Sequence, residues 1–199
     1  MALHEGADGL DGYLLWRATP GHGVVPDGTV VVRELVAASP WAYRALWAHA
    51  LSIDRTRHVT VGSAAVDEPL LHLVDEPRAL RSRVADGLWL RILSVPAALQ
   101  TRRYATGIDA VIEVRDADIP ANQGRWHLVG DRNAASCTAT RAPADLRLDV
   151  AALAATYLGG ASPAALHAAG LVDEVRPRAV AALTAAMCWD RAPSAIEDF

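Results

Sequence analysis

The sequence contains no lysine, so arginine supplies every permanently charged basic side chain among its 199 residues. Acidic residues outnumber the arginines by 23 to 19, and the net charge is −4. Surfaces that bind nucleic acids usually carry an excess of basic residues. We therefore expect no nucleic-acid partner.

Long apolar runs are missing as well. Asp, Arg, His or Gly interrupts each alanine-rich stretch, whereas a membrane-spanning helix needs about 20 consecutive apolar residues. The first residues also lack the basic segment and apolar run of a secretory signal. We expect a cytoplasmic protein with no membrane span.

Metal-binding and nucleophilic patterns are equally scarce. Cys137 and Cys188 are the only cysteines, the seven histidines form none of the usual ligand spacings, and no G-x-S-x-G motif occurs. A disulfide between the two cysteines stays open, but two small buried apolar side chains in a reducing compartment are the simpler interpretation. We expect no metal site and no complete catalytic set within this chain.

One glycine-rich stretch deserves comparison with a phosphate-binding loop. Arg17 precedes Gly21-His22-Gly23, much as an arginine precedes the glycines that hold pyrophosphate in acyl-CoA-dependent transferases. Such a loop works through its backbone N–H groups and the helix that follows. Here the spacing is one residue too long, Pro20 removes a donor and a strand pattern follows. The sequence favours a hairpin loop.

Arginine-rich clusters occur at Arg55 and Arg57, between Arg78 and Arg83, and at Arg102-Arg103, and acidic residues separate them from one another. This interleaving predicts solvated faces or local ion pairs.

The apolar periodicity predicts strands and helices in both halves of the chain. The first ten residues read as a loose lead-in. Predicted strands cover residues 12–18, 29–36, 58–61, 88–95, 108–115, 125–130, 135–141 and 146–149, with the strand at 108–115 half-buried and antiparallel. Predicted helices start at Pro40, Pro96, Val150, Pro163 and Pro177, and two short helical turns fall within 67–80. A joint near Asp86-Gly87 divides the chain into domains at 1–86 and 87–199. The fold class is α+β.

The chain ends in Glu197-Asp198-Phe199. A terminal phenylalanine gives the α-carboxylate an apolar anchor, and a fixed, partly desolvated carboxylate is a competent general base. An exposed or simply packed tail is the alternative that the residues leave open.

Several motifs in the second half resemble the carboxyl-terminal region of Eis-type (enhanced intracellular survival) GNAT N-acetyltransferases of actinobacteria. They are Val95-Pro96-Ala97-Ala98-Leu99 with Arg103-Tyr104, Gly124-Arg125-Trp126, the run from Asp145 to Leu153 leading into Tyr157-Leu158-Gly159-Gly160, and Asp190-Arg191-Ala192-Pro193 before Phe199. The resemblance implies a sterol carrier protein 2-like (SCP2-like) domain here, with an antiparallel sheet packed with helices. Residues 11–87 are similar to the family's second, degenerate acetyltransferase-like domain.

The resemblance also implies what the chain does. This sequence would begin partway into the second domain, so the amino-terminal acetyltransferase domain that binds acetyl-CoA would be absent. The Phe199 carboxylate would act as general base on a cationic amine substrate, either lysine side chains or aminoglycoside-like polyamines. Asp198 and Glu197 would bind that substrate, and no cofactor would be bound by this chain alone.

The same resemblance implies a homo-oligomer, because the family is hexameric, and a chain that is inactive without the missing domain. Two alternatives stay open: a non-enzymatic carrier of sterols or other lipids, and an assembly domain.

Overall fold

The computed structural model describes residues 1–19, 21 and 27–195. Met1–Ala85 and Asp86–Pro193 form two compact units, each with its own sheet and core. The α+β class is therefore confirmed, and each unit is described by itself.

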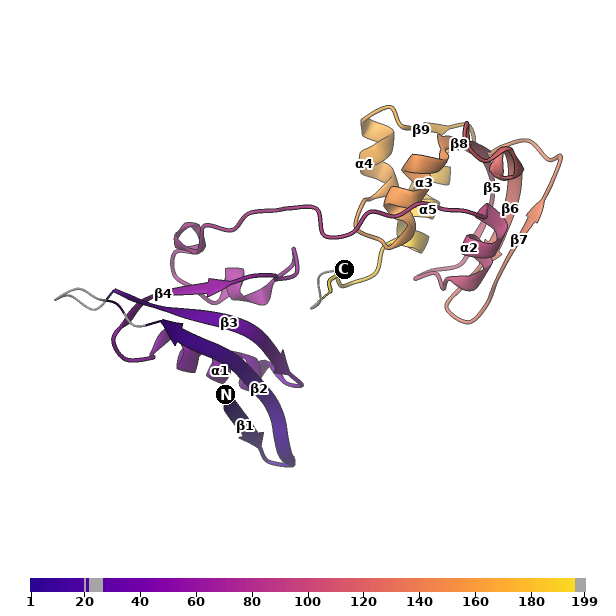
Figure 1. The fold of residues 1–199 in the computed structure, drawn as a ribbon. Coiled ribbons are helices and arrows are strands. Elements are labelled where there is room, and N and C mark those ends of the chain that lie inside the picture. The colour runs from indigo at the N-terminus through magenta and orange to yellow at the C-terminus, as the bar shows by residue number, and fades with distance from the viewer. Residues whose placement is uncertain (20, 22–26, 196–199) are drawn as a thin grey trace. The chain divides into compact units, whose positions relative to one another are not determined.

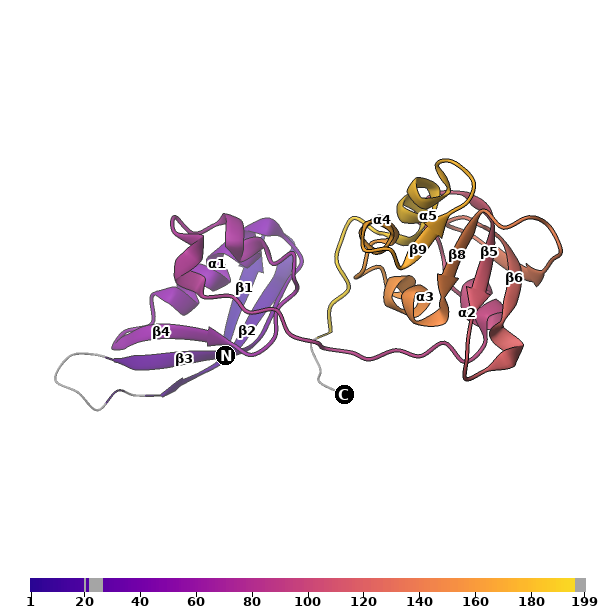
Figure 2. The ribbon, with the colours of Figure 1, turned by 90° about the horizontal axis from the view of Figure 1, so that it is seen from above.

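The first unit is a four-stranded sheet with one helix against it (Figure 2). Its elements are β1 (Ala2–Gly6), β2 (Gly9–Thr19), β3 (Gly28–Ala37), α1 (Pro40–Leu51), β4 (Thr56–Val61) and the 3-10 turns η1 (Pro69–His72) and η2 (Pro77–Leu80). The sheet order is β1-β2-β3-β4; β1, β2 and β3 are antiparallel neighbours, and β4 runs parallel to β3. A parallel pair needs a crossover connection, and α1 supplies it.

The predicted start of α1 is confirmed. Ser39 has an extended backbone and its hydroxyl accepts the Ala42 amide, while Pro40 opens the helix. Leu46, Trp47 and Ala50 are buried against the sheet, but Leu51 is exposed.

The loose lead-in predicted for the first ten residues is wrong. Residues 2–6 form β1, which pairs with β2 across a tight connection at Gly9. The His4 ring lies 2.5 Å from the Asp11 carboxylate on β2, so a polar pair supports a strand that carries little apolar periodicity.

The second unit is a five-stranded sheet with helices against one face (Figure 1). Its elements are α2 (Val95–Thr101), β5 (Ile108–Arg115), η3 (Pro120–Asn122), β6 (Gly124–Gly130), β7 (Ala135–Ala139), β8 (Leu146–Asp149), α3 (Val150–Tyr157), α4 (Pro163–Ala168), β9 (Val172–Glu174) and α5 (Ala179–Met187). The sheet order is β7-β6-β5-β8-β9.

Successive side chains along each strand of this sheet point alternately into the core and to the outer face. Ile112, Leu128 and Leu148 point into the core with α2, α3 and α5, whereas Glu113 and Arg147 lie on the opposite face. Each fully buried leucine stabilises the unit by roughly 1.5–3 kcal/mol. The prediction for 108–115 needs one correction: β5 is antiparallel to β6 but parallel to β8, so it is an interior strand, mostly buried.

The strand predicted at 88–95 is also wrong. Residues 81–92 form no helix or strand, and α2 already begins at Val95. Leu90 and Ile92 pack on the core, while Trp89 and Leu93 are 85% and 73% exposed. Buried and exposed residues do alternate here, as in a strand. The buried ones, however, pack a connecting segment against the core, and this segment joins no sheet.

Two helix boundaries differ from the prediction as well. The helix α2 ends at Thr101 instead of continuing to Tyr104, and α5 starts at Ala179, because Arg178 has the left-handed φ of 71° that cannot continue a helix.

Candidate functional site

The predicted site residues Glu197, Asp198 and Phe199 lie outside the described residues. The structure does describe the preceding part of the same segment, from the end of α5 at Met187 to Ala195. We call Met187–Pro193 the exit segment, because it carries the chain out of the second unit's last helix.

Arg102, just after α2, holds the start of the exit segment. Its Nη2 donates to the Met187 carbonyl at 2.9 Å, and its Nη1 donates to the Tyr157 carbonyl at 2.6 Å and also contacts the Met187 sulfur. Tyr157 and Met187 are the last residues of α3 and α5. The carbonyls at a helix end lack partners within the helix and carry the negative end of its dipole. One guanidinium therefore caps two helices.

Two tyrosines bracket this guanidinium. Its central carbon lies 4.9 Å from the Tyr104 ring centre and 5.7 Å from that of Tyr157. Both hydroxyls are occupied: Tyr104 donates to the Leu99 carbonyl at 2.7 Å and Tyr157 to the Ala98 carbonyl at 3.1 Å. Burial raises the pKa of the Tyr104 phenol far above its usual value, so it stays a donor.

This geometry corrects the prediction for the Arg102-Arg103 pair. Arg103 is exposed as expected, but Arg102 is partly buried and its partners are backbone carbonyls and aromatic rings. Burial lowers the pKa of Arg102 below its usual value, yet an arginine remains charged at any physiological pH. Sequence reasoning missed this residue, because the signal is a contact with residues far along the chain.

The exit segment then crosses the end of α3. Gly159 has a φ of +86°, and a Cβ placed there would lie 3.1 Å from the Met187 carbonyl oxygen. A Cβ on Gly160 would lie 3.4 Å from the Pro193 ring. The predicted glycine cap of this helix is confirmed, and it also gives the exit segment room to pass closely.

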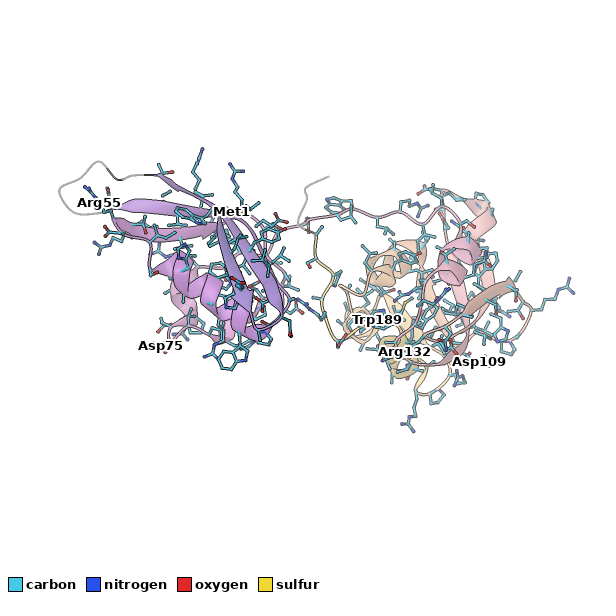
Figure 3. The ribbon with its side chains drawn as sticks, turned by 90° about the horizontal axis from the view of Figure 1, so that it is seen from below. Met1, Arg55, Asp75, Asp109, Arg132 and Trp189 are labelled. Carbon is cyan, nitrogen blue, oxygen red and sulfur yellow. The ribbon has the colours of Figure 1, made fainter. Side chains whose placement is uncertain are left out.

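Arg132 supplies a further contact. Its guanidinium lies 5.6 Å from the centre of the Trp189 ring, and the two side chains are seen together in Figure 3. Its Nε donates to the Ala105 carbonyl at 2.9 Å, and the Ala105 amide donates to the Ala186 carbonyl in α5 at 2.8 Å. The exit segment is thus held at Met187 and at Trp189.

A buried polar cluster fixes the segment that leads into the second unit. Asp116 is 2% exposed and accepts from Arg91 Nη2 at 2.6 Å and from the Asn122 side-chain amide at 2.9 Å. Asn122 also donates to the Ile92 carbonyl and accepts the Val95 amide. Asn122 thus supplies backbone hydrogen bonds that a neighbouring strand would otherwise supply to the segment before α2. This explains why residues 88–95 are held without joining a sheet.

The outer face of the second sheet carries paired charged and polar side chains that are partly exposed. Glu113 lies 2.7 Å from Arg125 and 3.8 Å from Arg147, and Asp109 lies 2.8 Å from His127. A shallow, open groove of about 620 Å³ borders this sheet near Asp109 and Asp131. Exposed pairs of this kind contribute little to stability.

Both cysteines are free; Cys137 is buried, as expected, and Cys188 is half-buried. Among residues 1–19, 21 and 27–195, no three His, Cys, Asp or Glu side chains gather as a metal ion would require. In the same part of the chain no helix is long and apolar enough to cross a membrane.

Two protein families match the sequence. A sterol carrier protein domain matches residues 95–195, and an acetyltransferase (GNAT) domain matches residues 1–92. The acetyltransferase match thus covers the amino-terminal part of this chain, and no finding shows that the domain there is partial.

Relatives of known sequence agree. An uncharacterized N-acetyltransferase of Streptomyces avermitilis is 43% identical over 92% of this chain and 45% of its own length. The N-acetyltransferase Eis of Mycobacterium tuberculosis is 34% identical over 90% of this chain and 43% of its own length. The crystal structure of Eis1 from Mycobacterium abscessus superposes with a TM-score of 0.77 at 36% identity, over 94% of this chain and 48% of that one.

The chain therefore spans less than half the length of these relatives. It belongs to the sterol carrier protein domain family over residues 95–195, matches an acetyltransferase (GNAT) domain over residues 1–92, and has Eis-like N-acetyltransferases among its homologues.

Proposed function

We propose that this chain is the carboxyl-terminal portion of an Eis-like, acetyl-CoA-dependent N-acetyltransferase acting on amines, and that its terminal carboxylate is the general base. The acetyltransferase (GNAT) domain match and the N-acetyltransferase homologues support acetyl transfer in general. The substrate class, either lysine side chains or aminoglycoside-like polyamines, follows only from the resemblance. We take residues 1–86 as a partial acetyltransferase-like domain and residues 87–199 as the SCP2-like domain.

The observation that carries the base assignment is the anchored exit segment. A terminal carboxylate can act as a base only if the chain before it is held. Arg102 and Arg132 contact this segment at Met187 and Trp189. Phe199 follows Pro193 by only six residues, and six fully extended residues span about 20 Å.

The chemistry explains why a carboxylate is needed. A protonated amine has no lone pair with which to attack a carbonyl carbon. The Phe199 carboxylate takes the proton from the amine nitrogen, and Asp198 and Glu197 attract the cationic substrate and favour its approach.

The described residues do not fit acetyl-CoA. The stretch around Gly21 lies partly outside them, and the element that follows it is β3, with no helix N-terminus for the pyrophosphate. The N-terminus of α1 is closed by Ser39, whose hydroxyl donates to the Asp11 carboxylate at 2.8 Å. That carboxylate would repel a phosphate. We therefore assign acetyl-CoA to a separate amino-terminal acetyltransferase domain and derive no step through it here.

That domain is the principal partner we propose, and the assembled protein is proposed to be a homo-oligomer. The lipid-carrier alternative is supported by the sterol carrier protein domain match over residues 95–195. We place acetyl transfer first, because the homologues of known sequence are N-acetyltransferases.

The experiment combines this chain with the amino-terminal half of the Streptomyces avermitilis relative. Transfer from acetyl-CoA to a lysine peptide and to an aminoglycoside is measured for each half and for the mixture. We expect transfer only in the mixture, and a loss of about 10²–10⁴-fold in kcat when Phe199 is deleted. Acetylation by this chain alone, or unchanged activity after the deletion, contradicts the proposal. Trp41→Ala, which alters an exposed residue of α1, is the control.

A further inference from the structure

We propose that Arg102 is a positioning residue: by capping α3 and α5 with one guanidinium, it fixes the point and direction from which the chain leaves α5 toward Phe199. The effect on the exit segment rests on the geometry alone. Its consequence for catalysis rests on the proposed function.

The first support is the kind of partner that Arg102 has. Among the described residues it forms no ion pair with a carboxylate, although the sequence is rich in acids. Its donors go to the terminal carbonyls of two helices, Tyr157 and Met187, which the negative ends of both helix dipoles make strong acceptors. Arginine suits this position because its planar guanidinium can donate to two acceptors at once, with Nη1 bonded to one carbonyl and Nη2 to the other.

The second support is the fixed orientation of the guanidinium. The rings of Tyr104 and Tyr157 bracket it, and the hydroxyls of both tyrosines are tied to α2 carbonyls. The orientation of the guanidinium plane is therefore fixed by contacts that involve both α2 and α3. Because Met187 is the last residue of α5, the same contact defines where the helix stops and the exit segment begins.

The third support is the short distance along the chain to the terminus. Phe199 follows Met187 by 12 residues and Pro193 by six. Without the Arg102 contacts, the direction in which the chain leaves α5 is no longer fixed at Met187, although Arg132 still contacts Trp189. A misplacement of about 1 Å can cost up to about 100-fold in rate.

The test uses the full chain with spin labels at Thr138→Cys and Arg191→Cys, in a Cys188→Ala background. Both labelled positions are exposed, one on β7 and one in the exit segment. Distance distributions are compared for the parent, Arg102→Met, Arg102→Lys and the matched control Arg103→Met. We expect a narrow distribution in the parent and control, a broad one in Arg102→Met, and intermediate broadening in Arg102→Lys, whose point charge cannot bridge two carbonyls.

A broad distribution in the parent, or a narrow one in a folded Arg102 variant, overturns the proposal. If Arg102→Met does not fold, Arg102→Lys and the parent still decide it. In the combined acetyl-transfer assay we expect kcat to fall about tenfold in Arg102→Met with an unchanged KM for acetyl-CoA, a split that general loss of structure would not give. If the parent shows no transfer, the proposed function fails while the distance measurement still judges Arg102.

Discussion

The side-chain amide of Asn122 donates to the Asp116 carboxylate at 2.9 Å, inside a unit whose other buried side chains are almost all apolar. The same amide group reaches the backbone of Ile92 and Val95, so it joins the β5–β6 connection to the segment before α2.

Replacing Asn122 should therefore be costly. Asn122→Ala leaves the Val95 amide and part of the Asp116 carboxylate without partners, and we expect a loss of about 2–3 kcal/mol in the free energy of unfolding. The neighbouring exposed residue gives the control: Gln123→Ala should change stability by less than about 0.5 kcal/mol. Urea unfolding of both variants measures the difference, and equal stabilities would show that the cluster contributes nothing.

Acid should weaken the second unit through Asp116. Burial by itself would raise the pKa of Asp116, but hydrogen bonds from Asn122, Arg91 and the amides of Ile119 and Asp118 hold that pKa well below its usual value. A carboxyl with a depressed pKa contributes stability that is complete above its unfolded pKa of about 4 and is lost as the pH falls further.

The variant Asp116→Asn removes this dependence. Its free energy of unfolding should be lower than the parent's at neutral pH, and it should change less between about pH 5 and about pH 2. Urea titrations at several pH values measure both slopes. Identical slopes would assign the acid sensitivity to other carboxylates.

The cap of α1 gives a prediction for the first unit. Ser39 accepts the Ala42 amide at 3.1 Å and donates to Asp11 at 2.8 Å. We expect Ser39→Ala to lower the stability of this unit by about 1 kcal/mol. Ser63→Ala, an exposed position in the same unit, should have almost no effect. Thermal unfolding of both variants separates a capping role from a general intolerance of serine replacement.

Local signals predicted much of the fold. The Ser39-Pro40 start of α1 and the alternation in β5 are recognisable because a cap and a period-two pattern are properties of neighbouring residues. The strand β1 was missed, since its support comes from the contact between His4 and Asp11. Arg102 was missed for the same reason: its acceptors, Tyr157 and Met187, are far away along the chain.

The wrong strand at 88–95 leads to a prediction of its own. Ile92 is 3% exposed in the core, whereas Trp89 is 85% exposed. We expect Ile92→Ala to cost about 2–4 kcal/mol and Trp89→Ser to cost less than about 0.5 kcal/mol. A paired central strand would lose stability at both positions. Chemical unfolding of the two variants distinguishes a segment that buries only one of its faces from a strand that buries both faces.

The central claim, that the terminal carboxylate is the base, can be tested by changing that group alone. Cys188 permits ligation of a synthetic peptide covering residues 188–199, so the protein can be made with either a free α-carboxylate or an α-carboxamide at Phe199. Both forms keep every side chain. Acetyl transfer is then measured after addition of the amino-terminal acetyltransferase half. We expect the carboxylate form to be active and the carboxamide form to lose at least about 100-fold in kcat; equal rates for the two forms would contradict the claim.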